Sequence, residues 1–138
     1  MSLLHASTVA FGREGGIVIM GPSGSGKSTL ALRLIAAGAQ LVADDRTIVM
    51  AREGRLFARA PRRIAGLMEA RGLAIVPIVP LRLARVRLVI DLALPPVRMP
   101  SEATRDLEGV SLPLLPAWGG DAFSAALRHY VAELKIKA

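Results

Sequence analysis

Cysteine is absent from the 138 residues of this chain. Without thiols the chain can form neither a disulfide framework nor a thiolate metal site, so nothing in it indicates an oxidising compartment. Long apolar runs are also missing, because proline or arginine interrupts them, and residues 1–16 lack the basic start and apolar stretch of a secretory signal. We therefore expect a cytoplasmic protein with no membrane partner.

Aromatic side chains are few: one Trp, one Tyr and three Phe. The formal charge is nonetheless +7, from 18 basic and 11 acidic residues, which raises the question of nucleic-acid binding. Proteins that bind single strands combine basic grooves with rings that stack on the bases, whereas here most of the arginines are scattered in ones and twos between Arg46 and Arg98. The composition favours an acidic protein partner or phosphate groups over nucleic acid.

The length favours a single domain over residues 1–138, with a core that needs no cross-links. Its first third predicts a strand at 3–11, a turn at 12–16, a strand at 17–20, a helix over 28–39 with a stop at Gly38, and a buried strand at 40–45. A strand, a glycine loop, a helix and a second strand form the right-handed βαβ unit that phosphate binding requires.

The rest of the chain predicts mostly strands and one helix. The expected elements are an antiparallel hairpin of residues 46–51 and 55–60 around Glu53-Gly54, a segment over 61–81 that is irregular and then extended, and a central strand at 85–94. A terminal amphipathic helix is expected over 121–134, with Asp121 as its N-cap. Its predicted apolar face consists of Phe123, Ala126, Leu127, Tyr130, Val131 and Leu134.

Residues 21–28 read GPSGSGKS and fit the phosphate-binding pattern of G, four residues, GK, then S or T. Its glycines allow backbone angles that turn consecutive N–H groups towards phosphate oxygens. The following helix start adds a partial positive charge, while Lys27 is expected to reach the β and γ phosphates and Ser28 to bind magnesium. The flanking strand and helix favour this interpretation over a glycine-rich turn without a ligand. The predicted nucleotide-binding residues are Gly21, Pro22, Ser23, Gly24, Ser25, Gly26, Lys27 and Ser28.

Two adjacent carboxylates, Asp44 and Asp45, follow Ser28 by 16 and 17 residues. One helix and one strand fill that distance, and parallel strands of a βαβ unit end at the same edge, so both acids are expected beside the loop. One acid could serve magnesium or the structure and the other could act as general base to a hydroxyl. The alternative is that the pair only opens a turn into the next hairpin, and we favour the functional interpretation.

Other polar residues give weaker signals. His5 reaches the same strand edge only if its strand pairs in register with residues 17–20, and a lone histidine is more often a surface or core residue. His129 on the terminal helix is expected to be structural. Glu69 and Arg71 could supply a metal contact or a clamp on phosphate, and otherwise they form a surface ion pair.

Three stretches resemble one family: LLHAS at 3–7, GPSGSGKSTLALRLIAAGAQLVADD at 21–45 and IAGLMEARGLAIV at 64–76. They are similar to the catalytic domain of HPr kinase/phosphorylase, which phosphorylates a serine of the bacterial phosphocarrier protein HPr, and the resemblance covers nearly the whole chain. It implies an α/β fold, a P-loop kinase-like domain with a mixed central sheet, an added antiparallel hairpin and a C-terminal helix. It also implies ATP and Mg²⁺ as cofactors, HPr as substrate, and a homo-oligomer, a hexamer in the family.

Residue roles follow from the same resemblance. His5 would belong to the active site, Lys27 would hold phosphate, and Asp45 would accept the proton of the target serine and return it in the reverse reaction. Ser28 and Glu69 would hold magnesium, the segment Met68 to Pro77 would shape the site, and Arg98 in VRMPSEATRDLEGVSLP looks like a further active-site arginine.

The chain also departs from the long members of that family. Only four residues precede His5, where the long members carry another domain, so the resemblance is to a compact, single-domain form. Residues 112–123 contain no arginine, whereas the long members have one in a stretch tied to dephosphorylation, so we expect the kinase reaction and leave phosphorolysis open as a second activity. Two alternatives stay open: a small-molecule P-loop kinase, with Arg59, Arg62 and Arg63 as its lid arginines, or a nucleotide-binding regulatory module without phosphoryl transfer.

Overall fold

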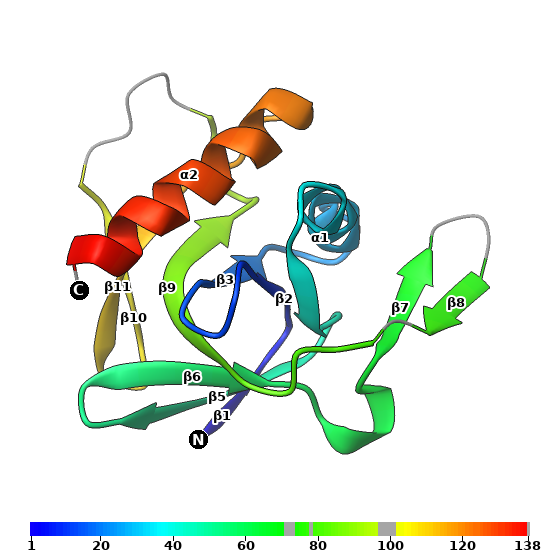
Figure 1. Ribbon diagram of the computed structural model, residues 1–138, viewed down its shortest axis with the longest axis horizontal. Helices are drawn as coiled ribbons and strands as arrows, with labels where there is room; N and C mark the ends of the chain where they lie inside the picture. Colours follow the sequence, from blue (N-terminus) through cyan, green and yellow to red (C-terminus); the bar gives the residue numbers. More distant parts are fainter. Residues whose placement is uncertain (71–73, 78, 97–101, 138) are drawn as a thin grey trace.

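The computed structural model describes residues 1–70, 74–77, 79–96 and 102–137. In this part of the chain most strands join one curved sheet, and two helices pack on it (Figure 1). The elements in chain order are β1 (Ser2–Leu4), β2 (Ala6–Ala10), β3 (Gly16–Met20), α1 (Lys27–Ala36), β4 (Gln40–Ala43), β5 (Thr47–Arg52), β6 (Arg55–Arg59), a 3-10 turn (Arg62–Ile64), β7 (Leu67–Ala70), β8 (Ala74–Pro77), β9 (Ala84–Asp91), β10 (Thr104–Leu107), β11 (Val110–Leu115) and α2 (Asp121–Lys137).

The sheet is mixed, as the family resemblance implies, and its order is β1-β5-β6-β9-β3-β2-β4 with β11 also paired to β9. Strands β3 and β9 are parallel neighbours, and β11 is parallel to β9. Strand β2 is antiparallel to both β3 and β4, so β3 and β4 run in the same direction with β2 between them. The C-terminal ends of β3, β4, β9 and β11 therefore lie at one edge of the sheet, where open α/β sheets bind ligands.

Side chains from alternate positions of the central strands enter two separate apolar clusters. Ile17 and Ile19 of β3 pack with both helices, while Val18 between them packs with residues of β5, β6 and the β10–β11 hairpin. Strand β9 behaves in the same way, because successive residues of a strand point to opposite faces. The helices thus cover one face of the sheet, and the curved end of the sheet closes over the other.

Helix α1 ends at Ala36, and the predicted stop Gly38 follows its C-cap Ala37 with a φ of 110°, which glycine adopts at little cost. The predicted hairpin around Glu53-Gly54 is present as β5 and β6, with Arg52 opposite Arg55. The segment from residue 61 is irregular and then extended, and β7 and β8 form a two-stranded sheet that projects from the body (Figure 1).

Several sequence predictions need correction. The strand expected over 3–11 breaks at His5, because β1 pairs with β5 whereas β2 pairs with β3 and β4. The two strands of the βαβ unit are parallel but are separated by β2, which the helical crossover spans. Residues 104–115 form the β10–β11 hairpin, which the sequence analysis missed although Glu108-Gly109 repeats the turn signal of Glu53-Gly54.

The apolar face of α2 is narrower than predicted. Leu127 and Val131 are buried and Phe123 and Leu134 pack against the same cluster, but Ala126 and Tyr130 are exposed. Ser124, which was not predicted to face the sheet, is buried. Asp121 was predicted to be the N-cap but is the first residue of the helix itself. Only side chains that recur every three or four residues along α2 contact the sheet, because a helix touches a curved surface along a narrow line.

In the part of the chain that the structure describes, neither helix has the length and apolar character needed to cross a membrane.

Candidate active site

The glycine-rich loop connects the end of β3 to the start of α1 at the ligand-binding edge of the sheet. Gly24 and Gly26 have φ values of 79° and 100°, which only glycine adopts at little cost, and Gly21 has no room for a side chain because an added Cβ would lie 2.6 Å from the Ser25 hydroxyl. No side chain of the described residues caps α1 at Gly26, and its first turn holds no acid. The helix start therefore presents backbone donors and partial positive charge suited to phosphate.

Lys27 is buried against the loop and donates hydrogen bonds from Nζ to the carbonyl oxygens of Gly21, at 2.8 Å, and Pro22, at 3.1 Å. Both acceptors are neutral. A phosphate oxygen is the stronger acceptor for an ammonium group because it carries charge. The amine is thus held at the loop, where an anionic ligand can take over as its partner.

Asp44 is buried and lies at the centre of a hydrogen-bonded group. Its Oδ1 accepts hydrogen bonds from the Ser28 hydroxyl at 2.7 Å and from the Ser7 hydroxyl at 2.8 Å. The Ser7 hydroxyl in turn accepts the Asp45 N–H at 3.0 Å. These bonds join β2, the start of α1 and the end of β4, and they hold the Ser28 hydroxyl beside a carboxylate.

Asp45 faces the opposite way and is exposed. Its φ is 65°, in a tight turn closed by a 2.7 Å hydrogen bond from the Arg46 N–H to the Asp44 carbonyl. A non-glycine residue in this conformation is strained, and such strain gathers at functional sites. The turn brings the Asp45 carboxylate to 2.9 Å from His5 Nε2.

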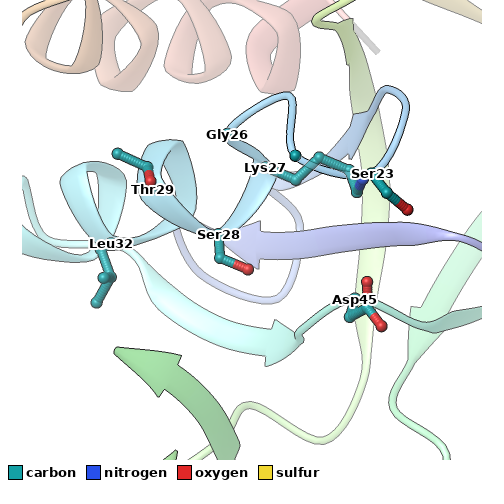
Figure 2. Close-up of a pocket in the computed structure, with 8 residues that line it drawn as sticks. Ser23, Gly26, Lys27, Ser28, Thr29, Leu32 and Asp45 are labelled. Carbon is teal, nitrogen blue, oxygen red and sulfur yellow. The ribbon is translucent and has the colours of Figure 1, made fainter. Parts of the chain in front are cut away.

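A pocket of about 230 Å³ opens between the loop, α1 and Asp45 (Figure 2). In Figure 2 the Ser28 hydroxyl points to the side on which Asp45 lies. A phosphate group held by the loop would therefore lie within the same hollow as the Asp45 carboxylate. The pocket is lined by Ser23, Gly24, Gly26, Lys27, Ser28, Thr29, Leu32 and Asp45.

Asp91 ends β9, the strand next to the one that leads into the loop, and two donors hold its carboxylate. Arg105 approaches its Oδ2 at 2.6 Å, and the Ala93 N–H donates to its Oδ1 at 2.8 Å. Burial alone would raise the pKa of Asp91, but the hydrogen bonds from Arg105 and Ala93 and the charge of Arg105 lower that pKa below its ordinary value. The carboxylate is thus held ionised at the edge of the sheet.

Most of the residues predicted from the sequence come together here. His5, Lys27, Ser28, Asp44 and Asp45 surround the loop, and Ala6 pairs with Met20, which is the register that carries His5 to this edge. His129 is exposed on α2 and does not line the pocket that contains Asp45.

The structure gives less detail for the predicted site residues further along the chain, Glu69, Arg71 and Arg98. Glu69 lies on β7, opposite Ile75, and its neighbour Met68 is buried in the cluster that includes α1, so this backbone packs beside the site. The Glu69 side chain, Arg71 and Arg98 lie outside what the structure describes. Among the described residues no three His, Asp or Glu side chains gather as a ready-made metal cluster.

Sequence reasoning missed Ser7 and Asp91 as parts of this edge. Ser7 lies two residues after His5, and Asp91 closes the apolar run RLVID as Asp44 closes LVAD. The position of Asp91 could have been predicted from the sequence, because a carboxylate that ends a buried parallel strand beside the loop strand lies at the same edge of the sheet.

Comparisons with known proteins agree with the fold and the loop. The family model described as HPr Serine kinase C-terminal domain matches residues 2–82. An HPr kinase/phosphorylase of Clostridium beijerinckii is 44% identical over 63 residues, 46% of this chain and 21% of its own length. One of Malacoplasma penetrans is 30% identical over 137 residues, 88% of this chain and 46% of its own length. The chain thus spans less than half the length of these relatives.

A solved structure, the Hpr(Ser) kinase/phosphatase from Coxiella burnetii, matches with a TM-score of 0.79 and 23% identity. The match covers 99% of this chain and 98% of that one. The two chains therefore share one fold over almost their whole length.

Proposed function

The chain belongs to the HPr serine kinase C-terminal domain family, and from this premise we propose that it is an Mg–ATP-dependent protein serine kinase that acts on an HPr-type phosphocarrier protein in the cytoplasm. The observation that carries the proposal is the different placement of the two adjacent acids. Asp44 is buried against the Ser28 hydroxyl, whereas Asp45 is exposed at the mouth of the phosphate pocket. A site that only binds nucleotide has no need of the second carboxylate.

Asp45 is suited to act as the general base. Its carboxylate borders the pocket and is open on the outer side, where a hydroxyl of another protein can approach. The hydrogen bond from His5 fixes its orientation without covering it. Phosphoryl transfer to a serine requires the protein to position the reactants and to stabilise the phosphate charge. It also requires a base for the serine proton, and a positioned carboxylate can supply that base.

The proposed step transfers the terminal phosphoryl group to the serine. The serine oxygen attacks the γ phosphorus and forms the new P–O bond, the bond from that phosphorus to the β–γ bridging oxygen breaks, and the serine proton passes to Asp45. Lys27 and the backbone N–H groups of residues 24–28 hold the phosphates and stabilise their charge. The other carboxylate at this edge of the sheet, Asp44, accepts hydrogen bonds from Ser7 and Ser28 and takes no proton in this step.

The donors at the loop fit magnesium. Ser28 and Asp44 offer a hydroxyl and a carboxylate oxygen at one point, which are the hard oxygen ligands that Mg²⁺ prefers together with substrate phosphates. When bound, the ion neutralises phosphate charge. Glu69 on β7, beside α1, is the further ligand that we propose from the family resemblance.

The partner and the assembly are part of the same proposal. The named relatives are HPr kinase/phosphorylases, which supports HPr as the protein substrate. We further propose that the chain forms a homo-oligomer, a hexamer by analogy with the family, that Arg98 serves the site, and that residues 1–138 fold as one domain. Light scattering behind size exclusion tests the assembly.

A labelling experiment separates this function from its two rivals. The protein is incubated with γ-labelled ATP, magnesium and purified HPr, and in parallel with a panel of small hydroxyl and nucleoside acceptors. The proposal predicts label on an HPr serine and none on the small acceptors. Label on a small acceptor alone supports the small-molecule kinase, and tight ATP binding without any transfer supports the regulatory module.

Phosphorolysis is tested with the same components. Phosphorylated HPr is incubated with excess inorganic phosphate and the release of pyrophosphate is measured. We expect kinase activity without pyrophosphate release, because residues 112–123 lack the arginine that this half of the reaction is tied to in the long members.

A further inference from the structure

A second pocket opens on the side of the glycine-rich loop that faces α2. Its volume is about 370 Å³, and its walls come from the loop, from α1 and from the segment between β11 and α2. The side chains that define it are Thr29 and Arg33 of α1, Leu92 after β9, and Ala117 and Trp118 before α2. None of these residues except Thr29 borders the pocket that contains Asp45.

The two pockets are continuous across the loop. Gly24, Gly26 and Thr29 line both, so a ligand whose phosphates lie on the loop can extend directly into the second pocket. The second pocket borders the C-terminal ends of β9 and β11, which are parallel neighbours, and ligands bind in crevices at such ends. A nucleotide that presents its terminal phosphate towards Asp45 would direct its other end here.

The walls of this second pocket suit a flat aromatic ring. Trp118 is 47% exposed although it is a large apolar residue, and Leu92 and Ala117 provide apolar surface next to it. Arg33 follows Thr29 by four residues on α1, so both side chains project from the same face of the helix. An indole ring and a guanidinium group both stack on nucleobases.

We propose that this pocket, bounded by Trp118 and Arg33, holds the nucleobase of the nucleotide whose phosphates occupy the glycine-rich loop. The inference rests on the proposed nucleotide-dependent function and adds the position of the base to it. Base recognition is by stacking on Trp118, with the Arg33 guanidinium at the other side, while Thr29 lines both pockets where they meet.

The single tryptophan of the chain makes the test direct. Emission of Trp118 is followed while ATP or inorganic tripolyphosphate is added to the wild-type protein, and affinities are measured by calorimetry for the wild type and for Trp118→Ala and Trp118→Phe. Tyr130→Ala is the control, because Tyr130 is a comparably exposed aromatic residue that does not line this pocket.

ATP is expected to quench Trp118 emission and tripolyphosphate to leave it unchanged. Trp118→Ala weakens ATP binding by about tenfold or more, the scale of losing a base–aromatic stack, while its affinity for tripolyphosphate stays that of the wild type, which also shows that the variant is folded. Trp118→Phe and Tyr130→Ala keep wild-type affinity for ATP within about threefold, since one retains a stacking ring and the other leaves the pocket intact.

Two results overturn the inference and leave the proposed function in place: unchanged ATP affinity in Trp118→Ala, or an equal loss of ATP and tripolyphosphate affinity, which would mean that Trp118 supports the loop and not the base. A wild-type protein that binds neither ligand contradicts the proposed function itself, and this inference with it.

Discussion

Asp44 and Asp45 are neighbours in the chain but meet different partners. Asp44 is buried and bound by Ser7 and Ser28, whereas Asp45 turns outward through a strained backbone conformation and meets His5. Under the proposed function the two identical side chains have separate roles, Asp44 beside the magnesium ion and Asp45 beside the serine hydroxyl.

His5 is a positioning residue in this account. Replacing it with alanine removes the 2.9 Å hydrogen bond to Asp45 and frees that carboxylate to rotate. We expect kcat for HPr phosphorylation to fall on the order of tenfold to a hundredfold with little change in the KM for ATP, because misplacement of a reacting group has costs of this size. Steady-state kinetics on HPr measure both constants.

His129→Ala is the matched control, since His129 is an exposed histidine on α2. His5→Gln, which keeps a hydrogen-bond donor, is expected to recover part of the lost rate. Wild-type kcat in His5→Ala would show that the bond to Asp45 has no role.

The sequence was sufficient to predict most of these residues but not the contacts among them. The glycine-rich loop and the position of Asp44 and Asp45 beside it could be predicted, because both follow from the pattern and spacing of residues within one short stretch of sequence. The contribution of Ser7 depends on β2 lying between β3 and β4, which is a long-range pairing with no local signal.

At the scale of elements, the ion pair of Asp91 and Arg105 links the end of β9 to β10 and so holds the β10–β11 hairpin at the ligand-binding edge. The hydrogen bonds to the Asp91 carboxylate lower its pKa in the folded state despite its burial. A carboxylate with a lowered pKa stabilises the fold at any pH above its ordinary value, and that contribution is lost as the pH falls through the lower, folded-state pKa.

Asp91→Asn is therefore expected to reduce the free energy of unfolding by about 2 kcal/mol at pH 7, the size of a hydrogen bond to a charged group. The difference from the wild type shrinks as the pH falls below about 3.9, where the carboxyl in the unfolded chain begins to protonate. Urea unfolding at a series of pH values measures this. Asp106→Asn, an exposed change on β10, is the control, and a pH-independent difference would contradict the assignment.

The elements that sequence analysis predicted well are those with strong local signals. Helix α1, the β5–β6 hairpin and the central strand β9 all consist of a clear apolar pattern bounded by glycine or proline residues. The break at His5 and the exposure of Tyr130 follow from which strand and which surface each segment meets, and neither property is encoded within the segment itself.

At the scale of the whole molecule, the sheet separates two apolar clusters, and strands β2, β3, β4 and β9 each contribute buried residues to both. Helix α2 packs on the sheet through Leu127 and Val131, both almost fully buried. The last helix and the first strands are thereby joined in one core, which is the basis for expecting one domain.

Leu127→Ala is expected to lower the free energy of unfolding by about 2–5 kcal/mol, since it leaves a cavity in that core. The loss should appear as a single cooperative transition that coincides when followed by circular dichroism and by Trp118 fluorescence. Ile136→Ala, at a residue that is 79% exposed on the same helix, should change the stability by no more than about 0.5 kcal/mol. Separate transitions for the two probes would instead show that α2 unfolds independently.

The central claim is that Asp45 accepts the proton of a protein serine. Asn is the appropriate replacement, because it tolerates the positive φ of this position and keeps the shape of the side chain while removing its basicity. The rate of HPr phosphorylation under saturating Mg–ATP should be measured for the wild type, Asp45→Asn and the exposed control Asp106→Asn, together with the affinity of each for ATP.

The account predicts that Asp45→Asn binds ATP as the wild type does but phosphorylates HPr at least about a hundredfold more slowly, the scale of losing a general base, while Asp106→Asn keeps the wild-type rate. A wild-type rate in Asp45→Asn would contradict the claim.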